Sequence, residues 1–186
     1  GFHGASHRFV SQRCAELRGT DKLRIISCHL GGSSSIAAVV DGKAVDSSWG
    51  MTPQSGLPQN NRAGDFDCFA LIYLARNLGL GLDTVEKALT SQSGLKGMSG
   101  LATGDIRDLD EAAAKGNANA RIALDMFANQ IRRFIGQFLV RMNGADVLIF
   151  TAGIGENSPN LRAAVCANLD FCGLELDPEL NAATRA

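Results

Sequence analysis

Three strand-like runs in the first fifty residues constrain the fold more than any other feature of this sequence. Leu23 to His29 is largely apolar, and Ile36 to Val40 follows it after a Gly/Ser-rich run. Asp41-Gly42 then separates the second run from Ala44 to Ser48. Asp-Gly between two strand-like runs is among the strongest short-range signals for a β-hairpin. The sequence therefore predicts a three-strand antiparallel meander with a Gly/Ser loop at one hairpin tip.

The hydrophobic period changes to that of helices from Asp67 onward. One helix is predicted from Asp67 to the glycines at 79 and 81, and a second opens at Asp83, with Glu86 as its reciprocal capping partner, and ends near Gly94. The longest helix is predicted between Ala118 and Met142, where apolar side chains keep a spacing of three and four. Asn143-Gly144 has the form of its C-cap.

The last part of the chain reads as a strand, a glycine turn and a helix. Val147 to Phe150 is a continuous apolar run, Gly153 to Asn157 predicts a tight turn, and Leu161 to Leu169 predicts a helix that begins near Ser158-Pro159. Strands and helices in this order indicate an α/β layer arrangement. Because no linker or repeat interrupts the chain, we expect one domain over residues 1–186.

Composition excludes several classes of function. The chain has 186 residues, of which 45% are hydrophobic, and a formal charge of −1. No Lys/Arg-rich run attracts a phosphate backbone or an anionic membrane, and no apolar run is long enough to span a bilayer. We therefore expect no nucleic-acid partner and no membrane association. Five scattered cysteines, without a C-x-x-C pair, favour free thiols in a reducing cytoplasm. The chain opens on Gly1 instead of Met, so we expect a fragment of a longer protein.

Two glycine-rich segments are candidates for nucleotide binding. The first comprises His29, Leu30, Gly31, Gly32 and Ser33, with Ser34 and Ser35 behind it, and its backbone N–H groups are suited to phosphate oxygens. A flexible hairpin tip is the plainer alternative. The second comprises Gly153, Ile154, Gly155, Glu156 and Asn157, and it follows a buried strand and precedes a helix, where nucleotides pack against glycine backbone. Taken alone, this segment is better explained as an ordinary strand-to-helix turn.

Charged side chains supply two further candidates. Asp105, Ile106 and Arg107 begin a predicted helix, so a carboxylate and a planar guanidinium could hold a ribose and a base. A helix N-cap with a surface ion pair is the alternative. Arg62 lies in a polar loop, where a phosphoryl-transfer enzyme needs positive charge, although a single loop arginine is usually only solvated.

Two histidines near the start of the chain are spaced like ligands on a helix. His3 and His7 are four residues apart, but the neighbouring glycines favour a loop. No third ligand accompanies the pair, so the sequence predicts no metal site within the chain.

Six segments match, in order, the motifs of one known family. They are Gly1 to His7, the His29 loop, Val45 to Pro53, the Arg62 loop, Asp105 to Asp108, and Phe150 to Ser158. Together they resemble the C-terminal part of the acetate kinase family, which includes propionate and butyrate kinases. The last segment, Phe-Thr-Ala-Gly-Ile-Gly-Glu-Asn-Ser, is identical to that family's motif.

The resemblance implies a fold, a reaction and a set of roles. The fold would be a ribonuclease-H-like domain of the actin, Hsp70 and sugar kinase group, with ATP between two such domains. The enzyme would transfer the γ-phosphate of ATP reversibly to a short-chain carboxylate, with Mg²⁺ ligands outside this chain, and it would form a homodimer. His3 and Arg62 would be catalytic, whereas the His29 to Ser33 loop, Asp105 to Arg107 and Gly153 to Asn157 would bind the nucleotide.

Three departures from the family pattern flank these motifs. Gly32-Ser33 stands where Asn-Gly is usual, Leu57 to Asn61 replaces a Met/Gly-rich stretch, and Trp49 replaces a typical Met. They leave the preferred acyl group open among acetate, propionate and butyrate. A non-enzymatic nucleotide-binding or dimerisation module is the alternative function, because half of the family's active site would lie outside this chain.

Overall fold

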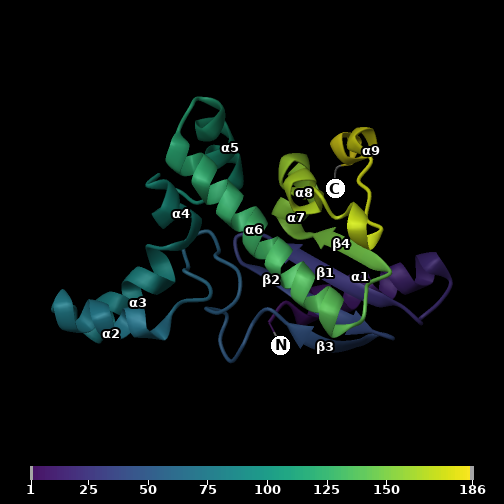
Figure 1. The fold of residues 1–186 in the computed structure, drawn as a ribbon, viewed down its shortest axis with the longest axis horizontal. Helices are drawn as coiled ribbons and strands as arrows, with labels where there is room; N and C mark the ends of the chain where they lie inside the picture. The colour runs from purple at the N-terminus through teal and green to yellow at the C-terminus, as the bar shows by residue number, and fades with distance from the viewer. Residues whose placement is uncertain (1, 185–186) are drawn as a thin grey trace. The chain divides into compact units, whose positions relative to one another are not determined.

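The structure contains a four-stranded sheet with the strand order β3-β2-β1-β4 (Figure 1). The structure, a computed structural model, describes residues 2–184. β1 (Arg24–Leu30), β2 (Ser34–Val40) and β3 (Lys43–Ser47) pair antiparallel, which confirms the predicted meander. β4 (Val147–Thr151) runs parallel to β1.

The turn between β2 and β3 has the backbone expected of Asp-Gly. Asp41 and Gly42 both have positive φ, at 49° and 75°, as a type I′ hairpin turn requires. Glycine adopts this region without steric cost, and Asp is among the residues that tolerate it best. The local sequence therefore determines this connection.

A helix occupies the N-terminal segment where we expected a loop. α1 (Gly4–Arg18) contacts β1 and ends at Gly19, which has a left-handed φ of 66°. Its two buried residues are His7 and Ser11. A glycine in a helix costs only about 1 kcal/mol relative to alanine, and the hydrogen bonds that His7 makes to the sheet offset such a cost. The loop expectation was wrong because those long-range bonds are not visible in local composition.

The middle of the chain is helical, with two differences from expectation. α2 (Cys68–Asn77) begins as predicted, and Asp67 accepts a hydrogen bond from the Phe69 N–H at 2.9 Å. α3 (Leu82–Ser91) has Gly81 at its N-cap, so the capping role predicted for Asp83 was wrong. α4 (Gly94–Ser99) was not predicted.

Two further helices of this region match the sequence prediction. α5 (Ile106–Ala114) follows its Asp105 N-cap, and α6 (Ala118–Arg141) is the predicted long helix. Within residues 2–184, no helix is both long and apolar enough to cross a membrane.

The segment after β4 is a short helix instead of the tight glycine turn we expected. α7 (Ala152–Asn157) follows the strand directly and contacts both β1 and β4. α8 (Pro159–Cys166) starts as predicted, with Pro159 in its first turn and the Ser158 hydroxyl accepting from the Leu161 N–H at 3.3 Å. A 3₁₀ turn, η1 (Asp170–Cys172), and α9 (Pro178–Ala183) complete the described chain.

The described chain divides into two compact units. The first contains the stretch up to Trp49 and the stretch from Ala128 onward, and it includes the sheet. The second is the contiguous stretch Gly50–Phe127. The single nucleotide-binding domain expected from the sequence stays a prediction.

Candidate functional site

The hairpin tip between β1 and β2 uses part of its backbone for its own fold. The Gly31 N–H donates to the Ser33 carbonyl at 3.2 Å and to the Ser34 hydroxyl at 3.3 Å. Gly32 is exposed, and a Cβ built there would meet no atom within 4 Å. Leu30 is fully buried, so it would contribute to a ligand only through its backbone. Anion binding at this tip would therefore depend on Gly32 and Ser33 rather than on Gly31.

His3 lies against this hairpin tip. Its Nε2 is 2.9 Å from the Ser33 hydroxyl, and its Nδ1 is 2.8 Å from the Ser35 hydroxyl. Its ring stacks on that of His29, with centroids 3.8 Å apart, and lies 4.4 Å from the Trp49 ring. The structure thus brings together three residues predicted for the site: His3, His29 and Ser33.

His7 lies one helical turn further along and is buried. Its Nδ1 hydrogen-bonds with Ser27 on β1 and its Nε2 with Ser35 on β2, both at 2.9 Å. Burial, and then the neighbouring His29 and His3, lower the pKa of His7 to about 4. The pKa of His29 is also lowered by burial, against an opposing effect of Glu156. At neutral pH, His7 is therefore an uncharged imidazole that ties α1 to the sheet.

The low pKa of His7 predicts a loss of stability in mild acid. The unfolded chain binds a proton near the ordinary histidine pKa of about 6.5, whereas the folded chain resists it down to about 4. The unfolded state therefore binds more protons in this window, and the free energy of unfolding falls as the pH drops from 6.5 towards 4. The loss should be about 3 kcal/mol in total. Urea titrations across this window measure it.

A His7→Gln variant serves as the control for this prediction. It removes the titrating ring, so its free energy of unfolding should change less between these two pH values than that of the unmodified chain. A residual slope is expected from His29, whose pKa is lowered in the same direction. If the free energy of unfolding of His7→Gln changed with pH as much as that of the unmodified chain, the assignment to His7 would be contradicted.

The turn from β4 into α7 holds a strained residue that Glu156 stabilises. Ala152 has a left-handed φ of 65°, a conformation that costs a non-glycine residue roughly 1–2 kcal/mol. The Glu156 carboxylate accepts from the Ala152 N–H at 3.0 Å and from the Thr151 hydroxyl at 2.9 Å. Such strained backbone is common at functional sites. The Glu156 side chain therefore stabilises the conformation of this turn.

The two glycines of α7 differ in what surrounds them. Gly153 is exposed, and a Cβ there would meet no atom within 4 Å. Gly155 is buried, and a Cβ there would lie 3.4 Å from the Phe150 backbone. The Asn157 amide donates to the Gly153 carbonyl at 3.0 Å, while Ile154 is half-buried. Gly153 is therefore the position in this segment at which a ligand could approach the backbone.

The loop that carries Arg62 is held by backbone hydrogen bonds within the second unit. The Leu95 N–H donates to the Gln59 carbonyl at 2.9 Å, and the Lys96 N–H donates to the Asn60 carbonyl at 2.8 Å. These N–H groups belong to the first turn of α4, which has no partners for them inside the helix. The Arg62 guanidinium is half-buried and donates to the Gln59 side chain at 3.4 Å. Arg62 is thus a cation on a fixed loop.

Asp105 and Arg107 form a helix N-cap with a surface ion pair, which was the alternative to nucleotide binding at this segment. Asp105 caps α5 by accepting from the Arg107 N–H at 2.9 Å, and its carboxylate pairs with the Arg107 guanidinium at 2.7 Å. The hydrogen bond from Arg107 lowers the pKa of Asp105. Ile106 is only 3% exposed, so its contact with a nucleotide would come from its backbone. Asn60 links this segment to the Arg62 loop, because its side-chain oxygen accepts from the Gly104 N–H at 3.2 Å.

The predicted residues therefore fall into two groups. The hairpin tip, His3 and α7 form the first group, in which Cβ atoms at Gly31 and Ala152 would lie 3.7 Å apart. Arg62 and Asp105 to Arg107 form the second group, in the other unit. Hydrogen bonds join His3 to Ser33 and Ser35 in the first group, and Asn60 joins the Arg62 loop to Gly104 in the second.

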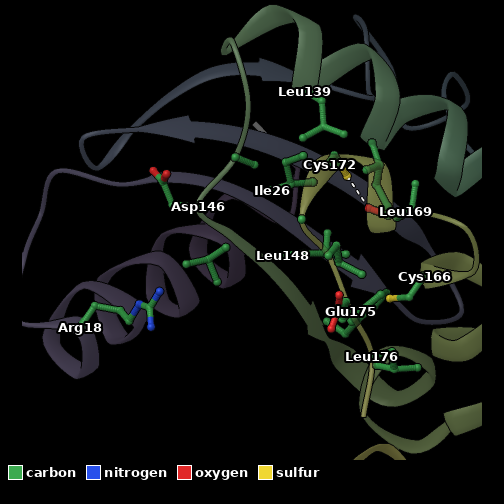
Figure 2. Close-up of a pocket in the computed structure, with 16 residues that line it drawn as sticks. Arg18, Ile26, Leu139, Asp146, Leu148, Cys166, Leu169, Cys172, Glu175 and Leu176 are labelled. Carbon is green, nitrogen blue, oxygen red and sulfur yellow. Dashed lines mark hydrogen bonds between the residues drawn. The ribbon is translucent and has the colours of Figure 1, made fainter. Parts of the chain in front are cut away.

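A cavity beside β4 contains none of the predicted site residues. It has a volume of about 490 Å³ and is lined mainly by apolar side chains, among them Ile26, Leu139 and Leu148, with Arg18, Asp146 and Glu175 as its charged members (Figure 2). The chemistry expected of the chain lies at the hairpin tip, so this cavity is not the candidate site.

Two polar residues that support the site, Ser27 and Arg162, were not predicted from the sequence. Ser27 is buried and bonds with His7, which also bonds with the buried Ser35 of the Gly/Ser run. Arg162 is also buried, and it donates to the Gly155 and Glu156 carbonyls at 2.9 and 2.7 Å. A serine inside an apolar strand and an arginine inside an apolar helix pattern were the available signals, because buried polar groups need partners.

Comparison with known proteins identifies the family. The Acetokinase family profile matches residues 1–186, which is the full sequence. The chain belongs to this family. The acetate kinases of Geobacillus sp. (strain WCH70) and Clostridioides difficile are 49% and 45% identical to it over 183 residues, which is 97% of this chain and 46% of each relative.

Solved structures of acetokinase relatives have the same fold. Porphyromonas gingivalis acetate kinase superposes with a TM-score of 0.96 at 40% identity, over 100% of this chain and 47% of that one. A Francisella tularensis propionate kinase gives a TM-score of 0.93 at 37% identity, over 98% and 47%. The predicted α/β fold of the actin, Hsp70 and sugar kinase group is thereby confirmed. This chain spans about half the length of the acetokinase relatives it matches.

Proposed function

We propose that this chain is the nucleotide-binding part of a carboxylate kinase that transfers the γ-phosphate of ATP reversibly to acetate or a similar short-chain acid. The observation that carries the proposal is His3, stacked on His29 and hydrogen-bonded to Ser33 at an exposed Gly/Ser hairpin tip. Membership of the acetokinase family supports the same reaction. The cytoplasm is the location we expect for such an enzyme.

The reaction needs charge stabilisation more than it needs a base. A carboxylic acid titrates near pH 4, so the nucleophile is already ionised at neutral pH. The transferred phosphoryl group spreads negative charge over its equatorial oxygens, and catalysis comes from donors aimed at those oxygens. We assign this role to the His3 imidazole and the Arg62 guanidinium.

ATP and Mg²⁺ are the cofactors that this reaction implies. The open Cα face of Gly153 and the exposed Gly32 fit close approach of a nucleotide and its phosphates. Arg107, whose side chain is 89% exposed, is suited to stacking on the base while Asp105 holds it. Bound Mg²⁺ would neutralise phosphate charge. Among residues 2–184, no cluster of three or more His, Cys, Asp or Glu side chains could hold a metal, and we assign its ligands to segments outside this chain.

A chimaeric enzyme tests the function directly. In it, this chain replaces the matching stretch of the Geobacillus acetate kinase, with which it shares 49% identity over 183 residues. The chimaera is incubated with ATP, Mg²⁺ and acetate, propionate or butyrate, and acyl phosphate is trapped with hydroxylamine. Product from any of the three acids supports the kinase, and the relative rates identify the preferred acyl group.

Two controls make the negative result informative. The unmodified Geobacillus enzyme shows that the assay detects product, and circular dichroism shows that the chimaera is folded. A folded chimaera that binds ATP but forms no product from any acid would contradict the kinase and favour the non-enzymatic nucleotide-binding module. The 186-residue chain alone should form no acyl phosphate, because phosphoryl transfer depends on the metal's charge and on positioning.

Gly153→Val is expected to weaken ATP binding to the chimaera by about tenfold or more, which corresponds to about 1.4 kcal/mol. The added side chain projects into open space in the protein, so it obstructs a ligand and not the fold. Calorimetry measures the affinity. Gly155→Val is the matched comparison: its branched side chain meets the Phe150 backbone and should lower stability as well. Unchanged ATP affinity in Gly153→Val would make the 153–157 segment purely structural.

The exposed face of α2 supports the expected homodimer. α2 has no buried residue, and Phe69 and Tyr73 are 72% and 63% exposed. Contiguous apolar side chains on a surface mark interaction sites, and we propose a second copy of this chain as the partner. Sedimentation of the chain and of a Phe69→Asp variant tests this: the unmodified chain should be dimeric and the variant should dissociate. A monomeric unmodified chain would contradict the dimer.

A further inference from the structure

Five side chains at the candidate site form one continuous series of hydrogen bonds. Ser27 on β1 bonds with His7 Nδ1 at 2.9 Å, and His7 Nε2 bonds with Ser35 on β2 at 2.9 Å. Ser35 also bonds with His3 Nδ1 at 2.8 Å, and His3 Nε2 bonds with Ser33 at 2.9 Å. Ser27, Ser35 and His7 are buried, whereas His3 and Ser33 are half-buried. We call this series the serine–histidine relay.

The chemistry of the groups couples the two rings. A neutral imidazole has one N–H donor and one acceptor nitrogen, and a serine hydroxyl has a single proton. His7 is neutral at pH 7, because its pKa is lowered to about 4. If both rings are neutral, a relay in which the Ser35 hydroxyl donates to one ring and accepts from the other has both protons on Nδ1 or both on Nε2. In a mixed pair, either two nitrogens compete for the one proton of Ser35, or both rings donate to its oxygen and the proton of this buried hydroxyl has no acceptor in the relay.

We propose that Ser27, His7 and Ser35 are positioning residues that hold His3 as the Nε2–H tautomer. In this arrangement the Ser27 hydroxyl donates to His7 Nδ1, and His7 Nε2–H donates to Ser35. The Ser35 hydroxyl then donates to His3 Nδ1, which leaves the His3 proton on Nε2, at the half-buried end beside Ser33. The inference rests on the proposed function, because a developing oxyanion on the phosphoryl group needs an N–H donor there.

His29 faces the relay without belonging to it. Its ring stacks on His3, and its charge state acts on His7. Its own Nδ1 bonds with Ser6 at 2.8 Å, and the charge of Glu156 acts on it in turn. His29 therefore reports on the surroundings of the relay and serves as an internal control.

Nitrogen-15 spectra of the histidine-labelled 186-residue chain test the relay without turnover. The chain has three histidines, so every imidazole signal belongs to His3, His7 or His29. Protonated and unprotonated ring nitrogens have well-separated shifts, which identify the tautomer of each ring. At neutral pH we expect Nε2–H at both His3 and His7. Ser27→Ala should shift the tautomer populations of both rings and leave His29 unchanged.

Three matched variants complete the test. Ser6→Ala should shift the tautomer populations of His29 and leave those of His3 and His7 unchanged. Ser35→Ala should uncouple the two rings, and Ser35→Thr, which keeps the hydroxyl, should restore the coupling. If circular dichroism shows that Ser27→Ala does not fold, Ser33→Ala at the half-buried end tests the same coupling, because it should shift the tautomer populations of the distant His7 ring.

Specific outcomes overturn the relay. They are opposite tautomers at His3 and His7 in the unmodified chain, Nδ1–H at both rings, or a Ser27→Ala or Ser33→Ala effect confined to the adjacent ring. Because these spectra need no substrate, their failure leaves the proposed kinase standing. Conversely, absence of acyl phosphate from the chimaera with the coupling intact would overturn the kinase and leave the tautomer coupling in place.

Discussion

Replacing Arg62 with alanine in the chimaera is expected to lower kcat by roughly 10²-fold or more, comparable to the loss of one oxyanion-hole donor. The guanidinium would interact with charge that develops during phosphoryl transfer, so ATP affinity should change little. Its loop is fixed by backbone hydrogen bonds from α4 that the substitution does not touch. Steady-state kinetics with separate kcat and KM values measure the effect.

Two variants control for the loss of charge. Arg62→Lys keeps a positive charge but loses the planar fork that matches phosphate oxygens, so it should recover only part of kcat. Arg76→Ala removes the same charge from the exposed end of α2 and should leave kcat unchanged. If Arg62→Ala matched Arg76→Ala, the catalytic assignment of Arg62 would fail.

Gly94→Ala is expected to be the most destabilising single substitution considered for this chain, at about 3 kcal/mol or more. Gly94 is buried at the start of α4 with a left-handed φ of 63°. A Cβ there would lie 2.2 Å from the Gln59 carbonyl oxygen and 2.6 Å from that of Arg62, both of which are backbone atoms that cannot rotate away. Urea unfolding of the chain gives the free-energy difference.

Gly100 provides a matched comparison at the other end of α4. Its φ is 69°, but a Cβ there would meet no atom within 4 Å. Gly100→Ala should therefore cost only the left-handed strain, about 1 kcal/mol. Equal losses in the two variants would show that the close approach to the Arg62 loop contributes nothing. In the chimaera, Gly94→Ala should also lower kcat, because the clash involves the backbone of Arg62 itself.

The elements that were predicted correctly are those specified by local sequence. Asp41-Gly42 determines its hairpin, and Asp67, Asp105 and Ser158 each cap a helix through their own side chains. Such signals act over two or three residues, so a single sequence reveals them.

The elements that were missed depend on partners far away in the sequence. α1 is tied to the sheet by His7, whose partners Ser27 and Ser35 are 20 and 28 residues distant. The α4 amides find their acceptors in the Gln59 to Arg62 loop. Backbone carbonyls carry no sequence signature, so neither α4 nor its hydrogen bonds to the loop that carries Arg62 could be predicted. The motifs included His3, His29, Ser33 and Ser35, but they did not include Ser27 and did not indicate that Ser35 connects the two histidines.

The sheet has a consequence for how the chain is made. β1 and β4 are adjacent strands, yet Arg24 and Asp146, which join their ends, are 122 residues apart. Gly50–Phe127 is contiguous and lies between the two strands in the sequence, so it can fold while the ribosome has not yet produced Val147–Thr151. Until then, one edge of β1 has no strand beside it, and unpaired apolar edges promote aggregation. We expect the nascent protein to be most dependent on chaperones in this interval of its synthesis.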